Sequence, residues 1–351
     1  MNVGHFVDQW LRTSETFILA QAKGVILTSY VIPGSPAAKT YAMEPMERLA
    51  FLASGRSASL AQAINAEKIN LIHAHFGTAG RLVLNTAKRC NVPVVTSFYG
   101  HDCYAYPTKN PSAYKKLFDE GTAFLALGKE MKETLIALGC PKEKIIVHHL
   151  GVPTQPAIRR KPKNKVVFLS VARFVEKKGL EYAIKAFVLL RKEMDCELRL
   201  VGNGPLLDEL KAASSGVQGV IFIDNFAAPE PRKVVEQEMK TADVFILPSI
   251  TAKDGDREGT PVTLMEASSF SLPCLSTMHS DIPEIVDNGK TGYLVPERDA
   301  QALYEKMKVL ASSPAKRAAM GRKAREKIAK EFNSKVQTKR LQKIYASLLK
   351  S

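Results

Sequence analysis

Short apolar runs rich in β-branched residues alternate with helical stretches along the chain, and this alternation occurs in two successive series. Strands that alternate with helices predict parallel sheets covered by helices on both faces. We therefore predict an α/β protein with two doubly wound domains. The expected strands are 3–7, 25–31, 71–76, 92–98, 123–127 and 145–150, then 166–171, 197–201, 220–223, 244–247, 273–276 and 292–295. The expected helices include 45–67, 80–90 and 129–138, then 180–191, 206–213, 234–240 and 261–269.

A segment at 151–165 separates the two series, and its three prolines and five basic residues indicate a linker. We expect an N-terminal domain over 1–155, a C-terminal domain over 156–333, and a last helix over 334–351 that packs back on the first domain. Ligands of doubly wound sheets bind beyond the carboxyl ends of the strands. The expected site is therefore a cleft between the two domains.

The composition is ordinary for a soluble protein, with 45% hydrophobic and 24% charged residues among 351. No apolar run is long enough to cross a bilayer, and the first residues lack the pattern of a signal peptide. The five cysteines lie far apart and have no metal-ligand spacing. These features favour the reducing cytoplasm.

The net charge of +15 is unevenly distributed, because residues 301–351 hold fourteen Lys and Arg against three Glu. One interpretation is peripheral contact with anionic lipid on the inner face of the plasma membrane. A second is a solvated helix surface. Nucleic acid is the least favoured partner, because no aromatic platform or known binding motif accompanies the charge.

Glu258 and Glu266 lie eight residues apart in "EGTPVTLME", across the expected start of a helix. We expect Thr260 as the N-cap and Pro261 at the first helical position. The free N–H groups and the dipole of a helix N-terminus attract anions such as phosphate. Two carboxylates around such a terminus would suit a nucleotide-sugar, which has hydroxyl groups on both sides of its diphosphate. The alternative is a capped helix with ordinary surface glutamates.

Arg173 and Lys178 follow the first strand of the second series, and Gly179 opens the next helix. An Arg fork and a Lys charge beside a helix N-terminus predict a diphosphate site, although surface cations are the alternative. "VGNGP" (201–205) is a second strand-to-helix turn, in which Gly202, Asn203 and Gly204 allow close backbone approach. The chain has neither a G-x-G-x-x-G dinucleotide motif nor a P-loop.

Histidines and acidic residues follow strands of the first series. We expect His101 and Asp102, in "SFYGHD", to project into the cleft, although a histidine in this position is often structural. The pair in "HAH" (73–75) shares a face of one strand, so packing is favoured over metal binding. The D-x-D at 254–256 is interpreted as a flexible polar loop, and no metal is expected there.

The ordered set of motifs in the second series resembles the retaining GT-B glycosyltransferases of family 4. These motifs are R173-x4-K178, "VGNGP" (201–205), E258-x7-E266 and "IPEIV" (282–286). Further motifs resemble the branch that builds bacterial exopolysaccharide, including colanic-acid-type enzymes. These are "SETFI" (14–18), "HAHFG" (73–77), "YGHD" (99–102) and "GDREGTPVTLMEA" (255–267).

The resemblance implies a GT-B fold with two Rossmann-like domains facing across a cleft. It also implies transfer of a sugar, with retention, from a nucleotide-sugar to a glycan or lipid-linked acceptor, without a metal or another cofactor. In that family, residues matching Arg173 and Lys178 bind the donor diphosphate, and one matching Glu266 holds the ribose. The same resemblance implies that Glu258, with Gly259, Thr260 and Pro261, binds the donor sugar. It implies that His101 contacts this sugar near the reacting carbon. It places Ser14, Glu15, Thr16 and Asp102 on the acceptor side of the site.

Three residues depart from the family pattern, at Ser268, Ser271 and Asp281. Two other classes of protein remain open. One is a nucleotide-sugar epimerase or a phosphorylase on the same architecture. The other is a non-enzymatic protein whose basic C-terminal region binds membrane or RNA. The sequence does not identify the sugar, the nucleotide base or the acceptor, although base selection near 223–226 is expected.

Overall fold

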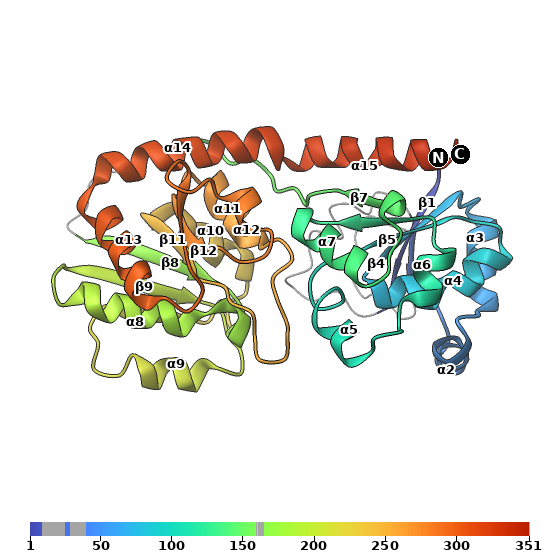
Figure 1. Ribbon diagram of the computed structural model, residues 1–351, viewed down its shortest axis with the longest axis horizontal. Coiled ribbons are helices and arrows are strands. Elements are labelled where there is room, and N and C mark those ends of the chain that lie inside the picture. Colours follow the sequence, from blue (N-terminus) through green and yellow to red (C-terminus); the bar gives the residue numbers. More distant parts are fainter. Residues whose placement is uncertain (9–24, 29–39, 159, 161–164, 351) are drawn as a thin grey trace. The chain divides into compact units, whose positions relative to one another are not determined.

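The computed structural model describes residues 1–8, 25–28, 40–158, 160 and 165–350 (Figure 1). The chain divides into two compact units. Unit 1 contains Met1–Gly151 together with Ser334–Ser351, and unit 2 contains Val152–Asn333. Each unit is built around one parallel sheet, as the alternation of strands and helices predicts.

Unit 1 has a seven-stranded sheet in the order β3-β2-β1-β4-β5-β6-β7, and all its neighbouring strands pair in parallel. The strand β3 at the edge was not expected from the sequence; the other six lie within the predicted runs. Their bounds are β1 (Val3–Val7), β2 (Val25–Thr28), β3 (Thr40–Ala42), β4 (Leu71–His75), β5 (Val94–Ser97), β6 (Ala123–Ala126) and β7 (Ile145–Val147).

Helices connect the strands of unit 1. The single helix expected over 45–67 is two helices, because Gly55 adopts a left-handed conformation that ends the first, and Ser57 caps the second by accepting from the N–H of Leu60. The bounds are α2 (Pro45–Ser54), α3 (Ala58–Ala66), α4 (Gly77–Arg89), α5 (Ala105–Lys109), α6 (Lys115–Glu120), α7 (Lys129–Ala137) and the 3₁₀ turn η2 (Lys142–Lys144).

The last helix, α15 (Ser334–Leu348), belongs to unit 1. Its buried Leu341 and Tyr345 share a hydrophobic cluster with Leu71 of β4 and Val95 of β5. Leu341 and Tyr345 are four positions apart, so they lie on one face of the helix. Burial of this apolar stripe holds the C-terminal segment on the sheet of unit 1.

A group of buried histidines lies in the sheet of unit 1. His5 of β1 stands opposite His73 of β4 in the strand register, and its Nδ1 lies 3.0 Å from Nε2 of His75. The Nδ1 of His73 lies 2.5 Å from the hydroxyl of Tyr345, and its Nε2 lies 2.7 Å from that of Ser97. The docking of α15 therefore includes a buried hydrogen bond as well as apolar contacts.

The histidines of this group are neutral in the folded protein, because burial disfavours the imidazolium ion. Burial lowers the pKa of His5 to about 4 and does the same for His148. For His73 and His75 burial again lowers the pKa well below its ordinary value. The sheet of unit 1 thus contains several groups whose protonation opposes folding.

Unit 2 has a six-stranded parallel sheet in the order β10-β9-β8-β11-β12-β13. The strands are β8 (Val166–Val171), β9 (Cys196–Val201), β10 (Val220–Ile223), β11 (Val244–Leu247), β12 (Cys274–Thr277) and β13 (Gly292–Val295). The helical elements are η3 (Glu176–Lys178), α8 (Leu180–Arg191), α9 (Leu207–Ala213), α10 (Pro231–Thr241), α11 (Val262–Ser269), α12 (Ile282–Ile285), α13 (Ala300–Ser312) and α14 (Pro314–Glu331). Figure 1 shows α10 and α11 on the opposite side of the strands from α8.

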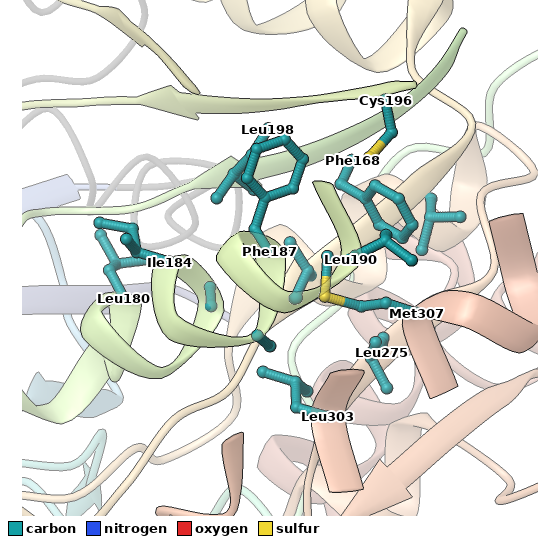
Figure 2. Close-up of a cluster of buried hydrophobic side chains, with 14 of the residues drawn as sticks. Phe168, Leu180, Ile184, Phe187, Leu190, Cys196, Leu198, Leu275, Leu303 and Met307 are labelled. Atoms are coloured by element: carbon teal, nitrogen blue, oxygen red, sulfur yellow. The ribbon is translucent and has the colours of Figure 1, made fainter. Parts of the chain in front are cut away.

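The main core of unit 2 lies between its sheet and the helices α8 and α13 (Figure 2). Phe168 and Leu198 come from neighbouring strands, Phe187 from α8 and Met307 from α13. All four side chains are completely buried. This apolar burial fixes the strands whose carboxyl ends carry the candidate site.

The expected linker is attached to unit 2 where it is described. Val152 bridges to Asn333, and the guanidinium of Arg160 donates to the carbonyls of Met239, Ala242, Phe270 and Ser271. Arg160 therefore ties the linker to unit 2, because its guanidinium makes four hydrogen bonds to carbonyls at the ends of α10 and α11. Burial lowers the pKa of Arg160 to about 10.

We predict that His5→Asn makes the stability of the protein less sensitive to acid. The folded-state pKa of His5 lies below its unfolded value of 6.5, so its contribution is complete above about pH 6.5 and is lost as the pH falls toward about 4. Between about pH 7.5 and about pH 5 the wild type should lose about 2 kcal/mol more than His5→Asn, by the linkage relation. Urea unfolding at both pH values measures this difference.

Burial raises the pKa of Asp8 to about 6, so protonation of Asp8 stabilises the folded protein as the pH falls. This effect opposes that of His5, and comparing the wild type with His5→Asn removes it. His101→Asn, at an exposed histidine, is the control for the loss of one imidazole and is unfolded in urea at the same two pH values. Equal losses in His5→Asn and the wild type would refute the prediction.

Candidate functional site

The carboxyl ends of β8 and β11 carry most of the residues that the sequence analysis selected. Arg173 and Lys178 follow β8, while Glu258 and Glu266 follow β11. These two strands are neighbours in the sheet, with Val244 paired to Phe168. Residues far apart in the chain therefore converge on one edge of unit 2, as expected for a parallel sheet.

Glycines allow the chain segments at this edge to pass close to one another. Gly179 has φ +61°, and a Cβ atom there would lie 1.9 Å from the carbonyl oxygen of Pro248. Gly202 has φ +142°, and its Cβ would lie 1.9 Å from the carbonyl oxygen of Ala172. No larger residue fits without displacing backbone, so these glycines set the positions of the loops after β8, β9 and β11.

Lys178 and Glu258 form a buried ion pair. The Lys178 Nζ lies 2.6 Å from Oε1 of Glu258, and the Ser249 hydroxyl donates to the same oxygen at 3.1 Å. Burial alone would raise the pKa of Glu258, but the charges of Lys178 and Lys177 outweigh it and hold this pKa at about 2. Glu258 is therefore a carboxylate at neutral pH, with Oε1 occupied by a cation.

Arg173 differs from Lys178 in its surroundings. Its side chain is exposed, and no hydrogen bond or ion pair joins it to any of the residues that the structure describes. A guanidinium without an internal carboxylate partner is available to an anionic ligand. Arg173 and Lys178 thus supply one free and one shared positive charge.

The turn after β9 is held by Asn203. Its Oδ1 accepts from the N–H of Gly204 at 2.7 Å, and its Nδ2 donates to Asp224 at 2.6 Å. The carbonyl of Asn203 also accepts from the N–H of Phe174. Asn203 therefore connects the loops after β8, β9 and β10.

Glu266 is buried in α11 and pairs with Arg232 of α10, with 2.5 Å between Oε1 and Nη1. Burial raises the pKa of Glu266, and the charge of Arg232 opposes that effect. The sequence analysis missed Arg232, because it lies 34 residues from Glu266 in the chain and nothing local connects them. Arg232 is half-exposed, so this pair borders solvent.

The start of α11 differs from the expectation. The helix begins at Val262, Pro261 occupies the N-cap position with extended backbone angles, and no side chain caps this end. Thr260 is therefore not the N-cap; its buried Oγ1 has no hydrogen-bond partner among the described residues. Thr260 and the buried Gly259 instead form the short segment between Glu258 and the helix.

The D-x-D segment before Glu258 is fastened. Asp256 pairs with Lys177 at 2.9 Å, and the same Lys177 Nζ donates to the carbonyl of Arg257 at 3.2 Å. The expectation of a flexible loop is therefore wrong for Asp256, whose carboxylate neutralises a cation of η3. Asp254 is exposed, and its Oδ1 accepts from the N–H of Asp256.

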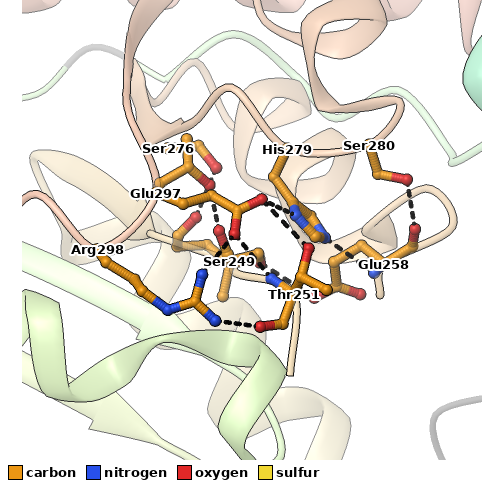
Figure 3. Close-up of polar contacts among 10 residues, drawn as sticks. Ser249, Thr251, Glu258, Ser276, His279, Ser280, Glu297 and Arg298 are labelled. Carbon is orange, nitrogen blue, oxygen red and sulfur yellow. Dashed lines mark hydrogen bonds and ion pairs between the residues drawn. The ribbon is translucent and has the colours of Figure 1, made fainter. Parts of the chain in front are cut away.

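Sequence analysis also missed two residues that hold the backbone of Glu258. The Nε2 of His279 accepts from the N–H of Glu258, and the Ser280 hydroxyl donates to its carbonyl oxygen (Figure 3). Both follow β12, directly before Asp281, which departs from the family pattern and is buried at the start of α12. Of the other departures, Ser271 adopts φ +62°, which explains a glycine preference there, and Ser268 is buried.

The residues selected in unit 1 are only partly arranged as expected. His101 is exposed on the turn after β5. Asp102 is buried, and its carboxylate accepts from the N–H groups of Tyr99, Gly100 and Gly77. The expectation that Asp102 projects into the cleft is therefore wrong, because its oxygens accept from the N–H groups of the turn and of the first residue of α4. Ser14, Glu15 and Thr16 lie outside the described residues.

Within the described part of the chain, one group of residues could hold a metal ion. The ligand atoms of His5, His73 and His75 all lie within 4.8 Å of one another. Their nitrogens are, however, hydrogen-bonded to one another and to Tyr345, Ser97 and Tyr99. The rings of His73 and His75 also stack, with their centroids 4.2 Å apart.

Comparison with known proteins places both units in families of sugar-transferring enzymes. Residues 152–327 match the family described as Glycosyl transferases group 1. Residues 10–156 match the one described as Glycosyltransferase Family 4.

Two curated relatives cover most of the chain. The amylovoran biosynthesis glycosyltransferase AmsK of Erwinia amylovora is 35% identical over 284 residues, 78% of this chain and 69% of AmsK. The putative colanic acid biosynthesis glycosyltransferase WcaL of Escherichia coli K12 is 35% identical over 309 residues, 84% of this chain and 74% of WcaL.

Solved structures show the same fold at low sequence identity. A glycosyltransferase from Rickettsia africae has a TM-score of 0.81 at 17% identity, covering 100% of this chain and 99% of that one. Anabaena HepE in complex with UDP and glucose has a TM-score of 0.79 at 17% identity, covering 99% of this chain and 100% of HepE. With both parallel-sheet units and these matches, the chain belongs to the family 4 glycosyltransferases of GT-B fold.

Proposed function

We propose that this glycosyltransferase moves a sugar from a nucleotide-sugar to a glycan or lipid-linked acceptor during synthesis of an exopolysaccharide. The observation that carries the donor assignment is the placement of Arg173, Lys178, Glu258 and Glu266 beyond two adjacent strands of unit 2. The relatives AmsK and WcaL, described as enzymes of amylovoran and colanic acid biosynthesis, support the exopolysaccharide assignment.

The two cations are proposed to hold the donor diphosphate. Arg173 is exposed and unpaired among the described residues, and Lys178 is already fixed at 2.6 Å from Glu258. A diphosphate gains negative charge as it leaves, so fixed positive charge stabilises the transition state more than the ground state. Gly202 and Asn203 would hold the adjoining turn close to the bound donor.

The two glutamates are proposed to bind hydroxyl groups. Oε1 of Glu258 is occupied by Lys178 and Ser249, and Oε2 would accept from the donor sugar. Glu266 would accept from the ribose while Arg232 holds its Oε1 in place. The unpartnered Thr260 hydroxyl supports a ligand beside the Glu258–Pro261 segment, because buried polar groups are seldom left without a partner.

We further propose that transfer proceeds with retention and without a bound metal. Attack on the face from which the diphosphate leaves would give retention, and no side chain is assigned as a nucleophile. His101 would contact the sugar near the reacting carbon, and its exposure supports that role. The ion pair between Lys177 and Asp256 supports metal independence, because the carboxylate of Asp256 in the D-x-D segment already pairs with a cation.

Peripheral contact with anionic lipid is proposed for α15. This helix has no acidic residue, and it exposes Lys335, Lys339, Arg340 and Lys343 opposite its buried stripe. Among the described helices, none combines the length and the apolar character that a membrane span requires. Electrostatic attraction to a charged leaflet would bring the enzyme to a lipid-linked acceptor.

Arg173→Ala is expected to reduce transfer at least about 100-fold without changing the melting temperature, because an exposed, unpaired cation contributes to charge stabilisation rather than to folding. Lys178→Ala should reduce transfer and also destabilise the fold by about 3 kcal/mol, because Glu258 is left buried and unpaired. Transfer is measured with the nucleotide-sugar that a melting-shift panel of nucleoside diphosphates identifies.

Lys211→Ala on α9, at an exposed lysine, is the control and should match the wild type. Full transfer by Arg173→Ala would exclude the proposed diphosphate site. An isomerised donor formed without acceptor would instead identify an epimerase.

Excess EDTA is expected to leave the rate of transfer unchanged. The new glycosidic bond is expected to keep the anomeric configuration of the donor, which NMR of the product measures. Asp254→Asn should also transfer normally, because Asp254 is exposed and makes only a local turn contact. Activity that EDTA abolishes and a divalent cation restores would exclude metal independence, and an inverted product would exclude retention.

Replacing Lys335, Lys339 and Lys343 by Gln is expected to weaken binding to phosphatidylglycerol vesicles about 100-fold, because each lysine near an anionic surface contributes about 1 kcal/mol. Binding of the wild type should fall with added salt and be absent on phosphatidylcholine vesicles. The matched control removes three exposed charges from α14, at Arg322, Lys323 and Lys330. Equal weakening by both triple variants would exclude α15 as the specific lipid surface.

A further inference from the structure

His279 contacts the backbone of Glu258 through a single, defined tautomer. Its side chain is completely buried, its Nε2 lies 3.1 Å from the N–H nitrogen of Glu258, and its Nδ1 lies 2.6 Å from Oε1 of Glu297. A backbone N–H can only donate, so Nε2 must carry the lone pair. The ring proton is therefore on Nδ1, where it is donated to Glu297.

Glu297 is itself held in place on the segment after β13. Its Oε2 accepts from the N–H of Thr251 at 2.9 Å and also pairs with Arg298 at 3.2 Å. Arg298 donates in turn to the carbonyl of Thr251. Burial would raise the pKa of Glu297, but the N–H of Thr251 and the ring of His279 lower it, so an ionised acceptor faces Nδ1.

The main chain and the carboxylate of Glu258 are consequently fixed by residues that follow different strands of the sheet. Its N–H and carbonyl are bound by the consecutive residues His279 and Ser280, and the Ser280 contact is 2.7 Å. Its carboxylate is bound by Lys178 and by Ser249. Figure 3 shows His279 between Glu297 and Glu258, and the Ser280 hydroxyl directed at the carbonyl oxygen of Glu258.

We propose that His279, oriented by Glu297, is a positioning residue that holds the Glu258 main chain so that the Glu258 carboxylate meets the donor sugar in the reactive geometry. The proposal deepens the proposed function and rests on it, because it requires Glu258 to bind the donor sugar. A displacement of about 1 Å in such a group can reduce a rate about 100-fold.

Two amide variants separate the two bonds of the imidazole. In His279→Gln the side-chain oxygen can replace Nε2 and accept from Glu258, while the bond to Glu297 is lost. In His279→Asn the amide can replace Nδ1 and donate to Glu297, while the Glu258 N–H loses its acceptor. The variants have similar polarity, so they form a matched pair.

We expect His279→Gln to keep kcat within about threefold of the wild type and His279→Asn to lower it at least about 30-fold. The affinity of both variants for the nucleoside diphosphate alone should be unchanged, because Arg173, Lys178 and Glu266 are intact. Wild-type kcat in His279→Asn, or equal losses in both variants, would overturn the proposal. A fall in nucleoside diphosphate affinity that parallels kcat would also overturn it, because it would show general disruption of the site.

A measurement that needs no substrate tests the same geometry. Nitrogen-15 NMR of the wild type should show His279 as the neutral tautomer with its proton on Nδ1, and the Glu258 amide signal should move in His279→Asn more than in His279→Gln. A proton on Nε2, or an imidazolium at neutral pH, would overturn the inference. Absence of transfer by the wild type from every nucleotide-sugar, with the expected tautomer present, would refute the proposed function and with it the positioning role.

Discussion

The ion pair between Lys178 and Glu258 is the interaction on which the candidate site depends. Glu258 is almost completely buried, and an unpaired buried carboxylate would be strongly destabilising. The pair forms where Gly179 lets the loop after β8 approach the loop after β11 to a distance that no side chain would permit. Backbone close packing thus makes the electrostatic arrangement possible, and the ion pair in return fastens the loop after β11 to that after β8.

Charge compensation recurs around this pair. Lys177 neutralises Asp256, Arg232 neutralises Glu266, and Arg298 pairs with Glu297. Arg173 is the site cation without such a partner among the described residues. Arg173 therefore carries the least compensated positive charge that an anionic ligand would meet. The other charged groups of the site are already held in position by their partners, which is the condition for electrostatic preorganisation.

Much of the architecture could be predicted because it depends on local pattern. The strand at 166–171, the helix at 180–191 and the turn at Gly202 follow from β-branched runs, helical periodicity and glycine, which act over a few residues. Errors arose where a tertiary contact replaced a local one. Thr260 was expected to cap α11, but it is buried and its hydroxyl has no partner among the described residues. Asp102 was expected to project into the cleft, but its carboxylate accepts from neighbouring backbone N–H groups.

The sequence by itself determined the two-sheet α/β class and the residue types beyond each strand, because both are encoded by short-range spacing. Only the tertiary structure decided which of those residues are joined. Arg232 meets Glu266 across 34 residues, His279 meets Glu258 across 21, and Tyr345 meets His73 across 272. Such pairs have no local signature, because they form only when the sheet and helices pack and bring the ends of separate elements together.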